Sequence, residues 1–247
     1  MGFSRMCILT VVLLPVLLGF AALTRGQSLT HTPDLLGLYP GMPNLAARAQ
    51  LQKHSSEVYV QDILGTGFGL MIPDPKNRDQ TSVFLTQPPN EPTVWMIQRA
   101  QTFDPAVSMS KENLLAALRQ KYGKENLWAD HGGGGLYYYW VFDRSGKLLA
   151  TPDPRFMSCS GSSFITNMTH GPDRTNDILA ICYGSFLGVT LYVNMRDAQL
   201  VRSYSVELVN MPYAVAAATI TMNANRAAEE SARQDELKKA NQNKPTF

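Results

Sequence analysis

The stretch at residues 103–150, FDPAVSMSKENLLAALRQKYGKENLWADHGGGGLYYYWVFDRSGKLLA, carries the clearest structural signals in the chain. Ser110 suits an N-cap because its hydroxyl can accept hydrogen bonds from the unpaired amides of a first helical turn. Apolar residues then recur at helical spacing, at Leu114, Leu115, Leu118 and Tyr122. Gly123 adopts the left-handed backbone conformation at low cost, so it is a natural stop. We therefore predict an amphipathic helix between Ser110 and Gly123.

A run of aromatic residues at 136–142 follows and alternates as a β-strand does. Tyr137 and Tyr139 fall on one face, whereas Tyr138, Trp140 and Phe142 fall on the other. Such a strand is either central and covered on both faces, or one of its faces is a contact surface. Tyrosine and tryptophan dominate binding hot spots. The candidate binding residues are therefore Tyr137, Tyr138, Tyr139 and Trp140, with a well-filled core as the alternative.

The rest of the chain predicts further strands and helices. The best strand signal is the β-hairpin formed by the alternating segments 189–195 and 203–208. Other strands are expected at 57–63, 82–86, 93–103, 147–150 and 177–183. A helix is expected at 43–54, where Pro43 suits the first turn. This order of hairpins and helices predicts an α+β fold with antiparallel sheets and packed helices, rather than a doubly wound parallel sheet.

The last part of the chain predicts a C-terminal helix. Residues 214–222 are small and apolar, so they are expected to dock on the sheet, whereas 223–239 reads as a polar helix. Residues 240–247 should fray. Self-association through this helix is one hypothesis for its role.

The first 26 residues have the layout of a secretory signal peptide. Arg5 precedes a nearly unbroken apolar run at 6–22, and Thr24 and Gly26 place small residues before a cleavage site. An uncleaved anchor is the alternative, although the run is short for a membrane span of ~20 residues. We therefore expect a signal peptide at 1–26, α+β units at 27–104 and 105–211, and a helix with a frayed tail at 212–247.

The charge of the chain argues against a nucleic-acid partner. The leader carries two of the 22 basic residues, Arg5 and Arg25, and none of the 20 acidic residues. The mature chain would therefore be close to neutral and would lack the basic patch that nucleic-acid binding requires. None of its segments is apolar and long enough to span a bilayer.

Two cysteines remain after the leader, Cys159 and Cys182. An even pair in an exported chain favours a disulfide over a metal site or a nucleophile. A loop of this length would stabilise the fold by roughly 3 kcal/mol. The leader and the disulfide together predict a periplasmic or secreted protein.

Three sequence patterns resemble catalytic motifs. Asp130-His131 before four glycines could place a general base beside a carboxylate, but a turn between helix and strand explains the same residues. Residues 158–163, SCSGSS, lack the Gly-x-Ser-x-Gly elbow and are better explained as the flank of a disulfide. Gly65, Gly67 and Gly69 are one position short of the dinucleotide fingerprint, so turn or bulge glycines are the simpler explanation.

Ligands and modifications receive little support from the sequence. The histidines are scattered without metal-ligand spacing, at His31, His54, His131 and His170. We expect no metal and no cofactor. The sequon Asn167-Met168-Thr169 matters only in a eukaryotic secretory route.

Two segments resemble each other, and together they resemble a known family. The segments 37–54 and 105–122 can be aligned so that Met42 pairs with Met109 and Leu51 with Leu118. They are either a true internal repeat or two ordinary amphipathic helices. A methionine-containing lead-in followed by a helix and strands is similar to exported domains of the BamE type of outer-membrane assembly lipoprotein, whose fold is shared with β-lactamase inhibitor protein. The chain departs from that family in lacking a lipidation cysteine and in its long tail helix.

That resemblance implies a protein that binds other proteins and carries no catalytic residues. We therefore expect an exported, non-catalytic protein that binds another protein or an envelope component. The alternative hypothesis is an envelope hydrolase or transferase that uses His131 with a nearby carboxylate.

Overall fold

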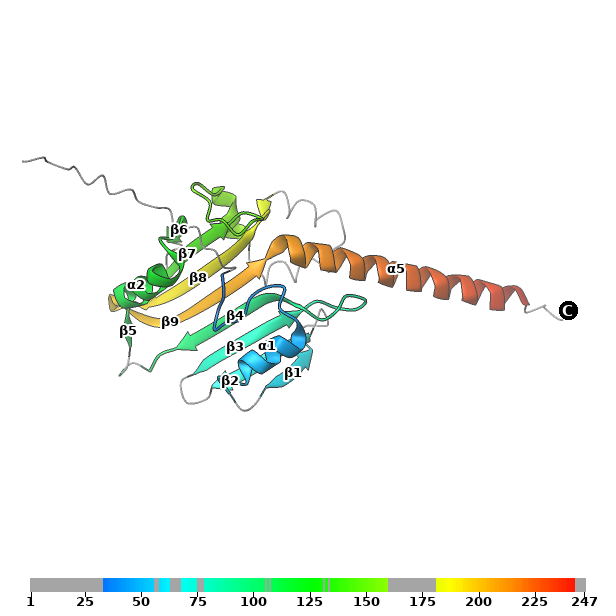
Figure 1. Cartoon of the computed structure of the whole chain (residues 1–247), viewed down its shortest axis with the longest axis horizontal. Helices are drawn as coiled ribbons and strands as arrows, with labels where there is room; N and C mark the ends of the chain where they lie inside the picture. The colour runs from blue at the N-terminus through cyan, green and yellow to red at the C-terminus, as the bar shows by residue number, and fades with distance from the viewer. Residues whose placement is uncertain are drawn as a thin grey trace, which may run out of the picture.

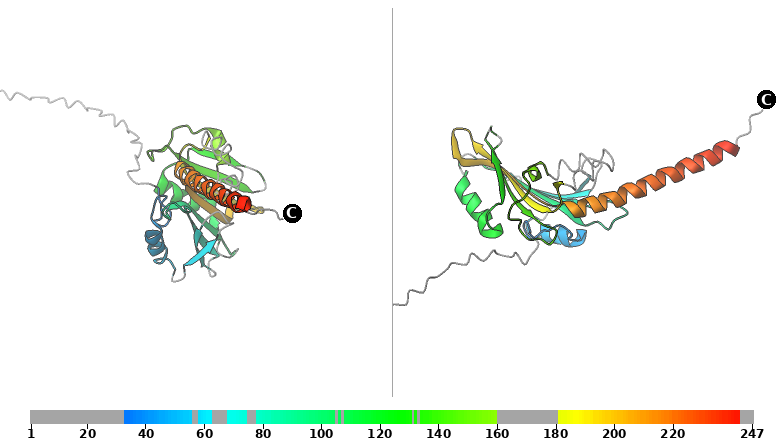
Figure 2. Two further views of the ribbon diagram at one scale, coloured as in Figure 1. Left: turned by 90° about the vertical axis from the view of Figure 1, so that its right-hand side faces the viewer. Right: turned by 90° about the horizontal axis from the view of Figure 1, so that it is seen from above.

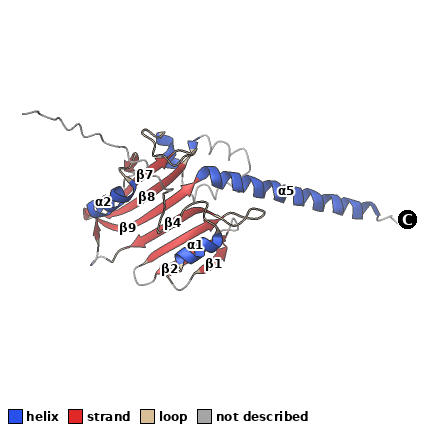
Figure 3. Ribbon diagram, viewed as in Figure 1, coloured by secondary structure: helices blue, strands red, loops and turns tan. Residues whose placement is uncertain are grey.

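A computed structural model of the chain describes residues 33–55, 58–62, 68–74, 78–104, 106, 108–130, 132, 134–159 and 181–242. The fold is α+β, with one antiparallel sheet and packed helices (Figures 1 and 3). The strands are β1 (Tyr59–Asp62), β2 (Phe68–Asp74), β3 (Asp79–Leu85), β4 (Val94–Thr102), β5 (Met109–Ser110), β6 (Leu127–Asp130), β7 (Gly135–Phe142), β8 (Ser185–Asn194) and β9 (Asp197–Asn210). The helices are α1 (Asn44–Leu51), α2 (Lys111–Tyr122), η2 (Pro154–Ser158), which is a 3-10 helix, and α5 (Met211–Gln242).

The sheet is assembled from two halves that meet at one pair of strands. Its order is β1-β2-β3-β4-β9-β8-β7-β6, and β5 adds to β9 outside this path. Each half is a helix followed by four antiparallel strands, α1 with β1 to β4 and α2 with β6 to β9. β4 pairs with β9 from Met96 opposite Val209 to Thr102 opposite Ser203, and we call this pairing the seam. The two expected α+β units therefore share a single sheet.

The helices α1 and α2 lie on the same face of the sheet, which we call the helix face (Figure 2, right). α2 begins as predicted, since the Ser110 hydroxyl accepts a hydrogen bond from the Asn113 amide at 3.1 Å. It also ends as predicted, at Gly123, whose φ is +80°. α1 follows Pro43 and buries Ala47 and Leu51. The two helices and the strands beneath them enclose one apolar core.

The opposite face of the sheet is covered at one end by η2, the disulfide and the first turns of α5. The sulfur atoms of Cys159 and Cys182 are 1.95 Å apart, which confirms the predicted disulfide. Phe156 of η2 is fully buried against Phe186, with ring centroids 5.7 Å apart. These groups form a second apolar core with Val141 and Val209 from the sheet.

α5 is a single helix of 32 residues that continues directly from β9 (Figure 1). Its first turns pack on the sheet as predicted, burying Ala214, Val215 and Ala218. Residues 225–242 are exposed and extend away from the sheet by about 27 Å at helical rise. Within the described ranges, none of the helices has the length and apolar character needed to cross a membrane.

The hairpin at 189–208 is confirmed as β8 and β9, but the structure differs from the other predicted strands in several places. β2, β5 and β6 were not predicted, because β2 contains Gly69 and Pro73 and the other two strands have only two and four residues. The strand expected at 147–150 is reduced to a bridge between Leu148 and Phe142. Ile181 is helical, so the strand expected at 177–183 is not formed at that residue, and most of that range lies outside the described residues.

The disulfide gives a direct test of stability. Replacing Cys159 and Cys182 together by serine should lower the free energy of unfolding by about 3 kcal/mol, because the bridge closes a loop of 23 residues. Urea titration of the variant and of the oxidised wild type measures this difference. Wild-type protein in reductant should match the variant. Equal midpoints for the oxidised protein and the variant would contradict a structural role for the bridge.

Candidate functional site

The aromatic strand β7 is covered on both faces over most of its length. Trp140 is fully buried on the helix face, where its indole Nε1 donates a hydrogen bond to the Gly123 carbonyl at 2.8 Å. Tyr139 is buried on the opposite face, and its ring lies 6.0 Å from that of Phe186. Tyr138 packs into the helix-face core with only 9 % of its surface exposed. Of the two predicted roles for this strand, the structure supports the central one.

Tyr138, Tyr139 and Trp140 are buried, which favours the alternative of a well-filled core for these three residues. The physical reason is that β7 lies between β6 and β8, with a core on each face. Sequence alternation assigned the two faces correctly but could not show that η2 and the disulfide cover the second one. Tyr137 is different, because it is only half-buried where it packs against the second core.

Tyr137 is paired with an exposed tyrosine that the sequence prediction did not include. Tyr192 of β8 is 46 % exposed and its side chain lies beside that of Tyr137. Burial raises the pKa of Tyr137, and the neighbouring Tyr192, which also shares a hydrogen bond with it, raises that pKa further. Burial also raises the pKa of Tyr139, to about 12. The phenols of Tyr137 and Tyr139 therefore stay protonated near neutral pH and can act as neutral hydrogen-bonding and packing groups.

Small and polar side chains continue from this tyrosine pair across the sheet. Residues in cross-strand register share a face, so the register places one row of side chains across five strands: Tyr137, Thr190, Ser205, Ala100 and Gln80. A second row contains Tyr192, Ser203 and Thr102. A third row includes Glu207 and Gln98, whose Nε2 donates to the Glu207 Oε1 at 3.0 Å. We call these ten residues the open face.

The open face is continuous with the covered end of the same side of the sheet. One further row toward α5 the side chains become apolar, at Val141, Phe186, Val209 and Met96, and these residues are buried. Ala100 and Gln80 are exposed, so the covering groups end before these rows. One side of the sheet is therefore divided into an apolar half beneath η2 and α5 and a polar half available to a partner.

The residues predicted for catalysis are not assembled into a site among the described residues. His131 lies outside the described residues, while the Asp130 carboxylate accepts the Gly132 amide at 2.8 Å in a turn. Cys159 is bonded to Cys182, so it is no thiol nucleophile. Gly69 lies within β2, and Gly65 and Gly67 lie outside the described residues. The described part of the chain contains no cluster of three or more metal-ligating side chains.

A polar cavity of about 320 Å³ lies where α5 begins. Its lining residues are Asp143, Arg144, Ser185, Asn210, Pro212 and Tyr213. The Asp143 carboxylate accepts hydrogen bonds from the Ser145 hydroxyl and from the backbone amides of Ser145 and Lys147, which lower its pKa. That carboxylate is therefore engaged in its own turn rather than poised as a general base.

The open face was partly visible in the sequence. The polar positions of β8 and β9, Thr190, Tyr192, Ser203, Ser205 and Glu207, alternate with apolar residues that fill the core. That alternation identifies an outward face. It contains no signal that β4 would lie beside β9 and extend this face with Gln98 and Ala100.

Comparisons of the chain with protein-family models, with curated proteins and with solved structures give no match in any of the three. The resemblance to BamE-type domains therefore stays a prediction.

Two aromatic substitutions separate the core from the open face. Trp140→Ala should lower the free energy of unfolding by about 3–5 kcal/mol, because it removes a fully buried ring and leaves a cavity. Tyr192→Ala should change it by less than about 0.5 kcal/mol, because its ring is half exposed. Chemical denaturation measures both. Equal losses would show that Tyr192 belongs to the core, and no loss at Trp140 would contradict the packing of β7.

Proposed function

We propose that the chain is an exported, non-catalytic protein that binds another protein through the open face. The observation that supports this proposal is the composition of that face. Two adjacent tyrosines lie beside serine, threonine, alanine and glutamine side chains. Protein-binding loops of antibodies use the same combination, in which tyrosine supplies rigid contact area and small polar residues supply adaptable hydrogen bonds.

The electrostatics of the open face support recognition rather than reaction. Glu207 is its one formally charged residue, and the Gln98 amide already donates to that carboxylate. Burial and the neighbouring Tyr192 raise the pKa of Tyr137, so its phenol provides no anionic nucleophile near neutral pH. A face with a single charge and many small side chains lets the backbone of a partner approach closely and use shape and hydrogen bonds for affinity.

Export is supported by the cysteine chemistry together with the sequence of the leader. Disulfides persist in the periplasm and outside the cell and are rare in the cytosol. Cys159 and Cys182 are bonded and buried, with 2 % and 5 % of their surfaces exposed. The predicted signal peptide at 1–26 lies outside the described residues, so its cleavage is part of the proposal.

The proposal is tested by measuring partner binding with matched aromatic variants. The oxidised protein is used to capture partners from the envelope fraction, and the affinity of the purified chain for each identified partner is then measured. Tyr192→Ala should weaken that affinity by at least tenfold, because exposed tyrosines are frequent hot spots.

Trp128→Ala is the matched control. Trp128 is 63 % exposed, but it lies opposite Tyr138 in register and therefore faces the helix side of the sheet. Its substitution should leave the affinity unchanged. A partner whose affinity is lowered by the Trp128 variant and not by the Tyr192 variant would move the contact to the helix side and contradict the proposal.

Self-association through α5 is a separate proposal, supported by the exposure of residues 225–242. Removing residues 223–247 should then lower the molar mass measured in solution from that of an oligomer to that of a single chain. The anchored turns of α5 are kept in this variant, so the sheet stays covered. A full-length chain that is monomeric at micromolar concentration would reject self-association.

A further inference from the structure

Two segments cross the seam on opposite sides of the sheet. At the seam itself, backbone hydrogen bonds join β4 to β9, and such a pair can twist and bend. The segment on the helix face is residues 33–42, which we call the strap. The segment on the other side is the start of α5 with the loop between β3 and β4.

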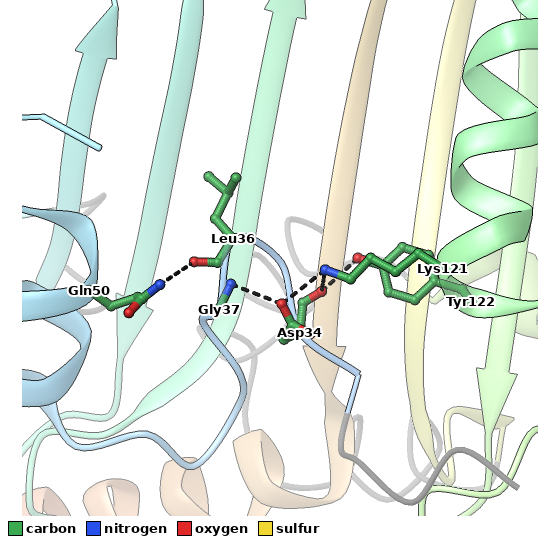
Figure 4. Close-up of polar contacts among 6 residues, drawn as sticks. All are labelled: Asp34, Leu36, Gly37, Gln50, Lys121 and Tyr122. Carbon is green, nitrogen blue, oxygen red and sulfur yellow. Dashed lines mark hydrogen bonds and ion pairs between the residues drawn. The ribbon is translucent and has the colours of Figure 1, made fainter. Parts of the chain in front are cut away.

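The strap is bound at one end to α2, in the second half of the sheet (Figure 4). The Asp34 main-chain oxygen accepts hydrogen bonds from the Tyr122 hydroxyl at 2.6 Å and from the Lys121 Nζ at 3.0 Å. The Asp34 carboxylate also accepts from Lys121 Nζ, at 2.9 Å. Burial lowers the pKa of Lys121, but its hydrogen bond to Asp34 and the nearby Tyr122 outweigh burial and leave that pKa raised. The lysine is therefore a cation when it holds the strap.

The same strap is bound to the first half of the sheet (Figure 4). The Gln50 side chain of α1 donates to the Leu36 carbonyl at 2.7 Å. Farther along, the Val94 amide donates to the Met42 carbonyl at 2.8 Å, which joins the end of the strap to β4. The strap therefore has polar contacts with both halves.

The middle of the strap is a tight turn that fills the core between the two helices. Leu35 and Leu38 are 7 % and 0 % exposed, and their backbones exchange hydrogen bonds of 2.8 and 3.0 Å. Leu36 has φ +57°, a conformation that costs a non-glycine residue roughly 1–2 kcal/mol. Gly37 has φ +76°, and a Cβ there would lie 2.3 Å from the Gln50 Nε2. A strained turn of this kind persists only where the surrounding contacts hold it.

The seam is also held on the opposite face of the sheet by contacts between α5 and the residues between β3 and β4, which we call the α5 clamp. The Asn90 side chain, in the loop between β3 and β4, donates to the Ala217 carbonyl at 3.0 Å and to the Thr221 hydroxyl at 3.1 Å. The hydroxyls of Thr93 and Tyr213 are also hydrogen-bonded. Because α5 continues from β9, these contacts tie the second half of the sheet to the first on the side of the open face.

We infer that the strap is a clasp that fixes the bend of the sheet across the seam and so sets the width of the open face. The strap on the helix face and the contacts of α5 on the other face restrain the bend of the β4–β9 pair from opposite sides. When the strap is released, only the contacts between α5 and the loop between β3 and β4 restrain the seam. The two halves of the sheet then bend toward the open face, and the distance across that face decreases. The link from this width to partner binding rests on the proposed function, whereas the width itself does not.

The width can be measured without any partner. Ala129 of β6 lies opposite Tyr137 and extends its row of the open face by one strand, so Ala129 and Gln80 of β3 are five strand spacings or about 24 Å apart. Nitroxide labels on Ala129→Cys and Gln80→Cys in the full oxidised chain report this distance by pulsed electron resonance. Adding Leu38→Ala should shorten and broaden the distance distribution.

Two further variants keep the test interpretable. Gln50→Ala and Asp34→Ala together remove polar contacts of the strap without deleting a buried apolar group, so they serve if Leu38→Ala fails to fold. Leu45→Ala is the matched control, since Leu45 is on α1 and 81 % exposed. If the strap variants have the same distance distribution as the wild type and Leu45→Ala, the inference that the strap sets the width of the open face is wrong. If a strap variant has the shorter distance and still binds its partner with wild-type affinity, the role of the strap stands and the proposed function is contradicted.

Discussion

The pairing of β4 with β9 is the constraint on which the rest of the structure depends. Each half alone is a helix on a four-stranded meander, with an edge strand whose amides and carbonyls lack partners. Joining the halves along seven residue pairs, from Met96–Val209 to Thr102–Ser203, removes both of those edges and produces one sheet. It also places the two helices on one side, so their cores merge under a common set of strands.

The same pairing creates the surface that we connect with function. Side chains alternate across a strand, so a register that directs Leu208 and Ile97 into the helix-face core directs Glu207 and Gln98 to the other side. That side is apolar only where η2, the disulfide and α5 cover it. Its remaining rows are small and polar, and they end at Tyr137 and Tyr192. The described part of the chain thus combines two apolar cores with one face that carries a single charge and whose groups suit recognition.

Local signals in the sequence were sufficient for the elements that are defined by their own residues. The Ser110 cap, the Gly123 stop and the alternation of β8 and β9 each depend on neighbours within a few positions, and all three are present in the structure. The face assignments of β7 were right for the same reason. What the sequence could not provide was the partner of each face, because residues 143–153 separate η2 from β7 and Cys182 lies 23 residues from Cys159. For that reason Trp140 and Tyr139 were proposed as contact residues although they belong to the core, and Tyr192 was missed.

The most direct measurement is a structure of the oxidised chain bound to a partner captured from the envelope. We predict that the partner covers the rows from Tyr137 to Gln80 and from Tyr192 to Thr102, with the helix face left outside the contact. A partner seated on α1 and α2, or one that leaves Tyr192 as exposed as in the unbound chain, would contradict it.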